Sequence, residues 1–442
     1  MAKNPLSAFM NIKRNELPLT LLMFSYFFAV ITTFWIVKPL KKAMFIGFYK
    51  SQGKLDLFGW QLEGSQAELI AKVMNMVVAF GAVIVFSTLA RRLRRQQLTL
   101  AFCAFCAVCF GGFLVLGEEP TEVKAWLFYL FGDLYNTLMV ATFFAFLNDS
   151  FSPSAAKRTY GPIILGGVSG GAFGSMFVAQ SVKSISFGAW MGIGIGITVV
   201  IAILAVFAGR IVDANPPPDR PGDEAKEEDG GNPAIDGARI VFRSRYLLAI
   251  VAIVGLYEII STMLDFQFTV TFEELLAADE LGSAFGTTYA ITNGLGLFVQ
   301  LFLTSYILSN FRHTVALLIM PVAIMLASGA YLAMPILYVG GALSVSDNGL
   351  NYSINQSARE ALYTPTSRDE KYKAKAFIDM FVQRFAKALA VGVSLLITTL
   401  LSNDIASMRY LSIITIALVL VWVFAARYAG NRFEELTADD QD

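Results

Sequence analysis

Charged and amide side chains recur at helical spacing inside otherwise apolar stretches of this 442-residue chain. Members of each set lie in helical register, so each set occupies one face of a helix. The five sets are Lys38, Lys41 and Lys42; Asp133, Asn136, Thr137 and Asn148; Glu258, Ser261, Thr262 and Asp265; Asp347, Asn351 and Asn355; and Lys375, Asp379, Gln383 and Lys387. Meeting at one axis, these faces would line a polar cavity that carries both signs of charge.

A cavity of this kind suits an anionic substrate. A charge at the centre of a bilayer costs about 2.5 to 3.5 kcal/mol on insertion scales, so such side chains normally face water or a partner. Basic members can bind the anion, while acidic members hold them, carry a counter-ion or proton, or contact a sugar or base. The candidate substrate-binding residues are Lys41, Asp133, Asn136, Glu258, Asn351, Asn355, Lys375, Asp379, Arg384 and Lys387. Pairing that simply fastens helices together is the structural alternative for the three carboxylates.

Composition identifies the elements that position these residues. Hydrophobic residues make up 56% of the chain and charged residues 15%, against about 25% in soluble domains. Apolar runs of about 20 residues, long enough to cross a bilayer, recur throughout the sequence. We predict an all-α polytopic membrane protein with about twelve transmembrane helices. They start near Pro18, Ala67, Leu98, Val123, Gly161, Phe187, Leu247, Phe285, Thr314, Tyr331, Ala374 and Leu411.

Basic residues concentrate in alternate loops. Arg91-Arg-Leu-Arg-Arg follows the second predicted span, and Lys157-Arg follows the fourth. Because cytoplasmic loops are enriched in Lys and Arg, this distribution predicts that both termini are cytoplasmic. We expect a multi-pass protein of a bacterial inner membrane.

A polar segment divides the predicted spans into two groups of six. Residues 213–237 are rich in Pro, Gly, Asp and Glu, which is typical of a flexible cytoplasmic linker. The N-terminal half would be residues 1–212 and the C-terminal half residues 238–442. Two six-helix halves around a cavity is the major facilitator architecture, although that superfamily's usual glycine, aspartate and arginine signature between spans two and three is absent.

Several other features have structural interpretations. Glycines between Gly166 and Gly174 have small-xxx-small spacing, which favours close helix packing over a phosphate loop. The three cysteines, Cys103, Cys106 and Cys109, are expected to pack as small apolar side chains. His313, the one histidine, is expected at the surface, which argues against a histidine proton relay.

Four further charges lie at predicted span ends. We interpret Asp149, Arg359, Glu360 and Arg368 as charges of a cytoplasmic gate or loop rather than as ligands.

Sequence stretches on both sides of the linker resemble the ATP/ADP translocases of plastids and obligate intracellular bacteria. Asp133-Leu-Tyr-Asn-Thr through Ala156-Lys-Arg-Thr-Tyr-Gly-Pro is similar to that family's fourth span and following loop, and Tyr257-Glu258 resembles its acidic seventh-span position. The tenth and eleventh spans give the closest match, in Leu350-Asn-Tyr-Ser, Ala358-Arg-Glu-Ala-Leu-Tyr-Thr-Pro, Lys373-Ala-Lys-Ala-Phe-Ile-Asp and Arg384-Phe-Ala-Lys.

The resemblance implies nucleotide transport by alternating access, as exchange or as proton-coupled uptake. By position, Lys41, Asp133, Glu258 and Lys375 match charged residues that the family needs for transport. The chain departs from the family in having Lys38-Pro-Leu-Lys-Lys where the family has Arg-Asp-Thr-Lys-Asp, and in having Asp133 in place of Glu. The loss of both acids leaves a more positive mouth, which favours a polyanion.

These observations favour a transporter over an enzyme, because neither a nucleotide-hydrolysis motif nor a metal-ligand cluster is present in the sequence. The expected partners are a small anionic substrate, membrane lipid and, as coupling ion, protons; no cofactor or nucleic acid is implied, and we expect a monomer. A proton- or sodium-coupled carrier of another organic anion, such as a siderophore or carboxylate, is the alternative. A scaffold or receptor without transport fits less well, because packing alone rarely needs charges on five helices.

Overall fold

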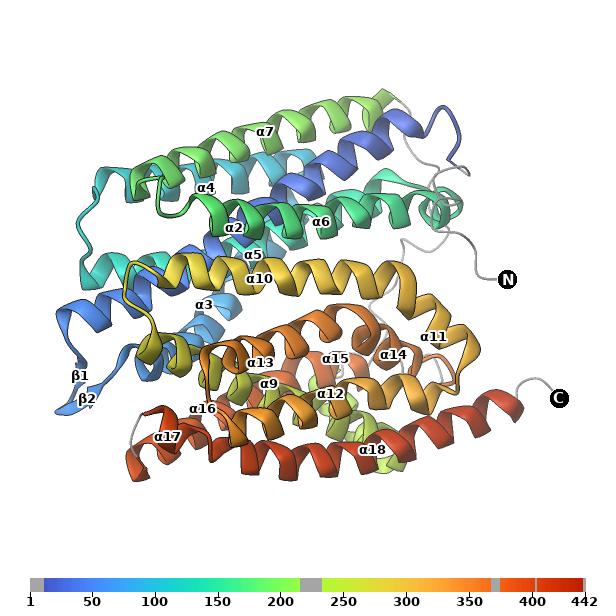
Figure 1. Ribbon diagram of the computed structural model, residues 1–442. Helices are drawn as coiled ribbons and strands as arrows, with labels where there is room; N and C mark the ends of the chain where they lie inside the picture. Colours follow the sequence, from blue (N-terminus) through green and yellow to red (C-terminus); the bar gives the residue numbers. More distant parts are fainter. Residues whose placement is uncertain (1–11, 215–232, 367–373, 402–403, 440–442) are drawn as a thin grey trace. The chain divides into compact units, whose positions relative to one another are not determined.

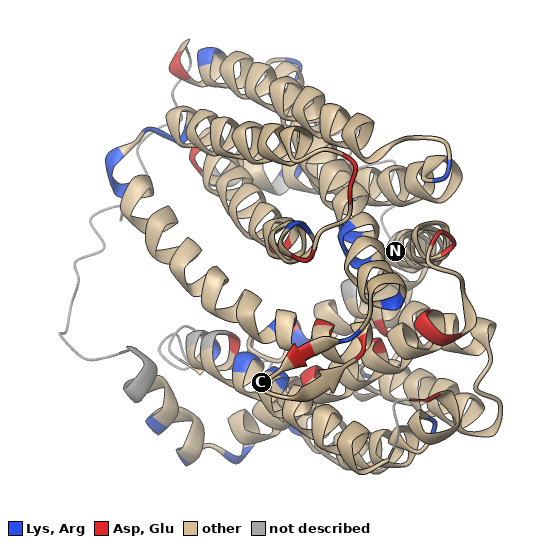
Figure 2. Ribbon diagram, turned by 90° about the vertical axis from the view of Figure 1, so that its left-hand side faces the viewer, with Lys and Arg blue, Asp and Glu red and all other residues tan. Residues whose placement is uncertain are grey.

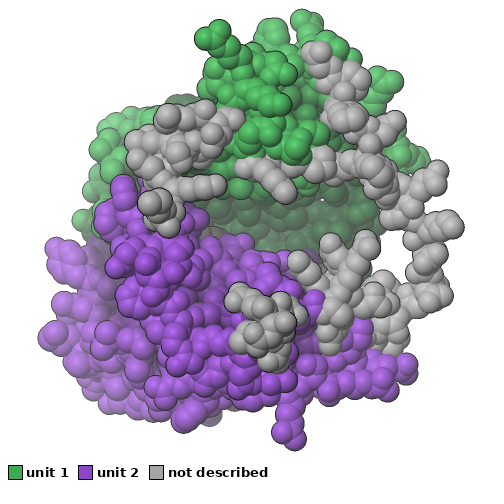
Figure 3. Space-filling model, turned by 90° about the vertical axis from the view of Figure 1, so that its right-hand side faces the viewer, with its two compact units in different colours: residues 1, 3–225, 277–293 green, residues 2, 226–276, 294–442 purple. Residues whose placement is uncertain are grey.

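The computed structural model describes residues 12–214, 233–366, 374–401 and 404–439 (Figure 1). They form helices joined by short turns, with one antiparallel hairpin of β1 (Leu55–Leu57) and β2 (Trp60–Leu62). The chain divides into two compact units, each with its own hydrophobic core. Unit 1 comprises the described parts of Lys3–Ala225 with Ala277–Asn293, and unit 2 those of Lys226–Leu276 with Gly294–Asp442 (Figure 3).

Unit 1 is built from long, uninterrupted α-helices. They are α2 (Leu17–Gln52), α3 (Gly64–Arg92), α4 (Arg95–Val115), α5 (Glu122–Ser150), α6 (Pro153–Ser181), α7 (Phe187–Ala214) and the first part of α10 (Leu281–Phe298). Side-chain caps start two of them: Thr121 accepts the Lys124 N–H ahead of α5, and Ser152 accepts the Ala155 N–H ahead of α6.

Unit 2 contains helices that change type along their length. Its elements are α8 (Pro233–Arg243), α9 (Arg245–Leu275), the remainder of α10, η1 (Val299–Thr304), α11 (Ser305–Asn310), α12 (His313–Ala333), α13 (Leu337–Leu350), η2 (Asn351–Asn355), α14 (Gln356–Ala361), α15 (Lys375–Phe377), η4 (Ile378–Val382), α16 (Gln383–Leu400), α17 (Ile405–Met408) and α18 (Leu411–Asp439). Elements η1, η2 and η4 are π-helical and continue directly from the α-helices before them.

The prediction of an all-α membrane protein is confirmed. Eleven helices of the described residues are long and apolar enough to cross a membrane, and Figure 2 shows how few of their residues are charged. The tenth predicted span, the stretch from α13 to α14, is not among the eleven. Its predicted start near Tyr331 is wrong, because α12 continues to Ala333 and Tyr331 is buried, with its hydroxyl 2.6 Å from that of Thr271.

The predicted linker, residues 213–237, is helical at both ends, because α7 extends to Ala214 and α8 begins at Pro233. Residues 215–232 between these helices lie outside the described residues, as does Arg368 of the predicted gate.

The glycine-rich part of α6 takes part in close helix packing, as predicted, and its partner is α2. Gly166, Gly170 and Gly174 face the backbone carbonyls of Phe24, Phe28 and Thr32, and a Cβ at any of the three would overlap a carbonyl oxygen. This close approach holds the two helices together through backbone-to-backbone packing.

The cysteines also behave as predicted, with Cys103 and Cys106 buried in the core of unit 1 and all three thiols free. The expectation of a surface histidine is wrong. His313 is half-buried, its Nε2 donates to the Ala358 carbonyl at 2.9 Å, and its ring packs on Phe433. At the start of α12, His313 therefore ties this helix to α14 and α18.

Candidate functional site

Lys41 and Asp133, two of the predicted binding residues, form an ion pair in unit 1. Lys41 is 5% exposed on α2, and its ammonium lies 4.3 Å from the ring centroid of Tyr129. The Asp133 side chain on α5 is 42% exposed and accepts a second hydrogen bond from Asn75 of α3. The exposed side of Asp133 is thus the direction from which solvent reaches the pair.

Gly132 lets the Lys41 side chain reach Asp133. A Cβ at Gly132 would lie 2.5 Å from Cδ of Lys41 and 3.0 Å from Cγ1 of Val37. The lysine stem therefore occupies the space that any larger residue at position 132 would fill.

A second charged cluster lies beside the first and includes residues that the sequence analysis missed. The Lys42 ammonium lies 3.2 Å from the Glu68 carboxylate, which also accepts a hydrogen bond from the Tyr129 hydroxyl at 2.9 Å. Lys72 lies 3.9 Å from Glu68 on the same helix, α3. Glu68, Lys72 and Asn75 are four and three residues apart, so the spacing rule applied to the other spans would have found them.

Two further predicted polar positions of unit 1, Lys38 and Asn136, are half-buried. Lys38 is half-buried, with its ammonium 4.3 Å from the ring centroid of Trp35 and 4.7 Å from that of Tyr289. Asn136 is half-buried on α5 and has no hydrogen bond to another described residue.

Two lysines of unit 2 pair with carboxylates that are partly open to solvent. Lys387 of α16 lies 3.6 Å from Glu258 of α9, and Lys375 lies 2.5 Å from Glu360. The Lys375 and Glu360 side chains are 36% and 50% exposed. In contrast to Lys41, which is itself buried, Lys375 is open to solvent along with its carboxylate partner.

The two predicted asparagines, Asn351 and Asn355, form a hydrogen bond with each other. The Asn355 amide donates to Oδ1 of Asn351 at 3.1 Å, and Arg359 Nη2 donates to the same oxygen at 3.4 Å. Asn355 is 1% exposed. One turn earlier, the buried Asp347 accepts a hydrogen bond from Ser261 at 2.7 Å.

The other predicted residues of unit 2 lie on or after η4. Asp379 is exposed and accepts from Gln383 Nε2 at 3.2 Å. Arg384 is exposed and forms no hydrogen bond or ion pair with another described residue. The hydrogen bonds from Asn355 to Asn351 and from Gln383 to Asp379 join members of the predicted polar faces. The π-helical turns of η2 and η4, which hold more residues per turn, are a feature that the spacing did not predict.

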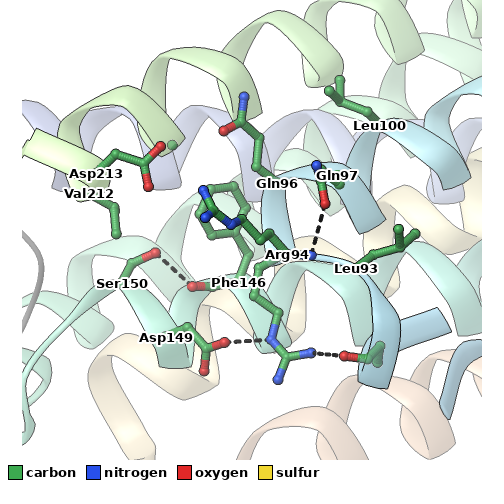
Figure 4. Close-up of a pocket in the computed structure, with 13 residues that line it drawn as sticks. Leu93, Arg94, Gln96, Gln97, Leu100, Phe146, Asp149, Ser150, Val212 and Asp213 are labelled. Atoms are coloured by element: carbon green, nitrogen blue, oxygen red, sulfur yellow. Dashed lines mark hydrogen bonds and ion pairs between the residues drawn. The ribbon is translucent and has the colours of Figure 1, made fainter. Parts of the chain in front are cut away.

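A cavity of about 560 Å³ lies at the ends of α3, α5 and α7 in unit 1 (Figure 4). Arg94, Gln96 and Asp213 line it, together with Asp149, which pairs with Arg95. None of the ten predicted binding residues lines this cavity. Among the described residues, no group of three or more His, Cys, Asp and Glu is placed to hold a metal ion.

Comparison with known proteins gives the family. The family model described as TLC ATP/ADP transporter matches residues 121–338 and 331–433. The chain belongs to this family. The resemblance seen in the sequence is confirmed, and this TLC family member is a membrane transporter rather than an enzyme.

Similar proteins are distant in sequence. The chain is 21% identical over 447 residues to the chloroplastic ADP,ATP carrier protein 1 of Arabidopsis thaliana, covering 86% of this chain and 70% of the carrier. It is 23% identical over 496 residues to ADP,ATP carrier protein 1 of Chlamydia muridarum, covering 96% of this chain and 90% of that protein.

Solved structures show the major facilitator fold. A bacterial homologue of the human lysosomal transporter Spinster superposes with a TM-score of 0.63 at 11% identity, covering 96% of this chain and 98% of that one. The nucleoside transporter NupG gives 0.60 at 14% identity, covering 94% and 99%. The major facilitator superfamily transporter FucP gives 0.52 at 12% identity, covering 92% and 99%.

Proposed function

We propose that this TLC family member carries a nucleotide across a membrane by alternating access, as an exchanger or by proton-coupled uptake. The main support is a lysine, Lys41, that is buried in a membrane helix beside a carboxylate with an exposed side. A buried charge of this kind is costly unless it serves a partner or a ligand. The ADP,ATP carriers to which the chain is similar support a nucleotide as that ligand.

Lys41 and Lys375 are the residues that we expect to neutralise phosphate groups. Each is held by a carboxylate, Asp133 or Glu360. Phosphate oxygens can take the place of the carboxylate oxygens, so that the lysine exchanges one anionic partner for another. Such an exchange gives the ligand different contacts in different states, which a ligand-driven conformational change requires.

We assign proton coupling, where it operates, to Glu258. Its side chain is 15% exposed, and its Lys387 partner lies at the long distance of 3.6 Å. Carboxylates of this kind, inside a membrane helix and only loosely paired, are the groups from which transporters build proton pathways. Transport by a Glu258→Gln variant should therefore lose its dependence on pH; retained dependence excludes this residue as the proton carrier.

We propose a bacterial inner-membrane protein with both termini cytoplasmic, active as a monomer. Alternating access would come from movement of the halves 1–212 and 238–442, with the linker of residues 213–237 joining them.

Uptake of labelled ATP and ADP by cells that express the protein tests the proposal. We expect accumulation that unlabelled nucleotides inhibit and that Lys41→Ala and Lys375→Ala abolish. Lys54→Ala is the matched control, because Lys54 also pairs with a glutamate, Glu63, at 3.1 Å but on the exposed hairpin.

The absence of nucleotide uptake, exchange and any nucleotide-induced shift in the melting temperature of the purified protein would overturn the proposal. Uptake of a carboxylate or siderophore that depends on pH and that nucleotides do not inhibit would favour the alternative of another organic anion.

A further inference from the structure

Arg359 is an unusual basic residue of unit 2. It lies on α14, half-buried, with its guanidinium carbon 5.0 Å from the ring centroid of Tyr257 on α9. Nη2 donates to Asn351, but Nε and Nη1 are buried and have no hydrogen-bond partner among the described residues. Arg359 also forms no ion pair with a described carboxylate.

Unfilled donors on a buried guanidinium are unfavourable, because the N–H groups have lost water without gaining an acceptor. Carboxylates are nevertheless present in the same part of unit 2. Lys375 pairs with Glu360, and Lys387 pairs with Glu258. Asp379 interacts electrostatically with Arg359, as well as with Lys375, Glu258 and Glu360. The guanidinium therefore belongs to this charged cluster while leaving two donors unused.

Neighbouring side chains fix the orientation of Arg359. The buried Tyr257 ring supports its plane, and Asn351 holds one nitrogen. Asn355 in turn donates to Asn351 and so fixes that amide oxygen as an acceptor. Asn351, held by Asn355, therefore keeps one donor of Arg359 in place.

We propose that Arg359 binds the phosphate chain of the substrate through Nε–H and Nη1–H. This inference rests on the proposed function in taking the substrate to be phosphorylated. The Nε–H and Nη1–H groups point from different edges of the planar guanidinium, so a single carboxylate is poorly shaped to accept from both. Neighbouring phosphates of a diphosphate or triphosphate offer several oxygens and satisfy both donors. Arg359 thus selects polyphosphate substrates, in contrast to the gate or loop role expected from the sequence.

Binding to the purified full-length protein tests this role, with ATP, ADP, AMP, adenosine and inorganic pyrophosphate as probes. In Arg359→Gln we expect the Kd for ATP, ADP and pyrophosphate to rise about 10- to 100-fold, as loss of charged hydrogen bonds implies. The adenosine Kd should stay unchanged. Arg359→Lys should give an intermediate loss, because lysine keeps the charge but lacks donors on two edges.

Arg409→Gln is the matched control. Arg409 also lies over a tyrosine ring, that of Tyr410, at 5.0 Å and has a buried Nε without a partner among the described residues. Its removal should leave all five Kd values unchanged. A merely structural role for Arg359 would lower the melting temperature in Arg359→Gln while keeping the ratio of the ADP and adenosine Kd values.

Three outcomes separate this inference from the proposed function. Unchanged ATP and ADP binding in Arg359→Gln overturns the role of Arg359 and leaves nucleotide transport standing. Pyrophosphate binding that Arg359→Gln abolishes, in a protein that binds no nucleotide, supports Arg359 and overturns the nucleotide as substrate. Failure of the wild-type protein to bind any of the phosphorylated probes overturns both.

Discussion

Both units hold a lysine paired with a carboxylate, but they hold it differently. In unit 1, Lys41 and Lys42 are 5% and 3% exposed and lie on an unbroken α-helix. In unit 2, Lys375 is more than a third exposed and lies on the short α15, three residues before the π-helical η4 begins. Charges removed from water depend strongly on their partners, whereas exposed pairs contribute little. Loss of a single partner should therefore be costly for Lys41 and Lys42 of unit 1, while Lys375 of unit 2 can exchange partners at low cost.

Helix type follows the same division. Among the described residues, the π-helical segments η1, η2 and η4 all lie in unit 2, and the six long helices of unit 1 contain no such segment. Segments of this kind are frequent at functional sites. Two of the three carry predicted binding residues, Asn351 and Asn355 in η2 and Asp379 in η4. We infer that unit 2 supplies the adaptable part of the substrate contacts and unit 1 the fixed part.

Asp133→Asn is expected to lower the free energy of unfolding more than the other variants that compare the two units. The substitution leaves the buried Lys41 ammonium without a carboxylate partner among the described residues. Loss of one partner of a buried pair costs about 3 to 5 kcal/mol, and we expect the low end of this range because the Asp133 side chain is 42% exposed. Glu360→Gln, the counterpart in unit 2, should cost less than about 1 kcal/mol because its pair with Lys375 is exposed. Thermal and denaturant unfolding of the purified variants measures both values.

The double variant Lys41→Met with Asp133→Leu is the control for this prediction. Replacing a buried pair with apolar residues is often neutral, so the free energy of unfolding should recover while transport stays lost. Equal losses of stability in Asp133→Asn and Glu360→Gln would remove the distinction between the units.

The sequence predicted the fold well because a bilayer imposes a simple rule. Each crossing needs about 20 apolar residues, and that requirement is visible without any knowledge of packing. The error at Tyr331 arose where α12 and α13 are both apolar and only Met334, Pro335 and Ile336 separate them. Hydropathy does not resolve so short a turn, although the proline marks it.

The candidate residues were predicted less completely than the fold. The pairing of Lys41 with Asp133 joins residues 92 positions apart, which spacing within one helix does not reveal. Glu68, Lys72 and Asn75 were visible as one face of a span but were not considered. The donors of Arg359 depend on which acceptors its neighbours provide, and the π-helical register of η2 depends on tertiary packing; neither has a signal in the sequence.

A smaller loss of stability is expected from Gly132→Ala in unit 1. The new methyl group would lie 2.5 Å from Cδ of Lys41, so the lysine must move away from Asp133. Overpacking of this kind costs about 1 to 3 kcal/mol, and we expect nucleotide uptake to fall with it. Unfolding and uptake measured on the same variant test the two effects together.

Gly255→Ala is the matched variant in unit 2. There the new methyl group would lie 3.5 Å from Cγ1 of Val382, an ordinary contact, and Gly255 is three residues from Glu258 on α9. It should be neutral, or stabilising by up to about 1 kcal/mol as glycine is replaced in a helix. If uptake falls as much in Gly255→Ala as in Gly132→Ala, then the contact between Gly132 and the Lys41 side chain has no particular importance for transport.

The smallest loss of stability is expected from Glu118→Gln. This variant tests whether the burial of a charged side chain, rather than its place in unit 1, makes its removal costly. Glu118 lies in unit 1 but is exposed, and it accepts the Gly188 N–H at 2.9 Å and the Phe187 N–H at 3.0 Å at the start of α7. The hydrogen bond from Gly188 holds the pKa of Glu118 below its usual value of 4.5, and the positive end of the helix acts in the same direction. Because the pKa is lower in the folded protein, the stabilisation is present above pH 4.5 and is lost as the pH falls through the folded pKa. Glu118→Gln should cost about 0.5 kcal/mol at pH 7, with the difference from wild type vanishing in acid. A melting-temperature series of both proteins from neutral to acidic pH measures this difference.

A loss of stability at pH 7 comparable to that of Asp133→Asn would mean that charges in unit 1 matter even when exposed, and burial would then no longer account for the difference between the two units.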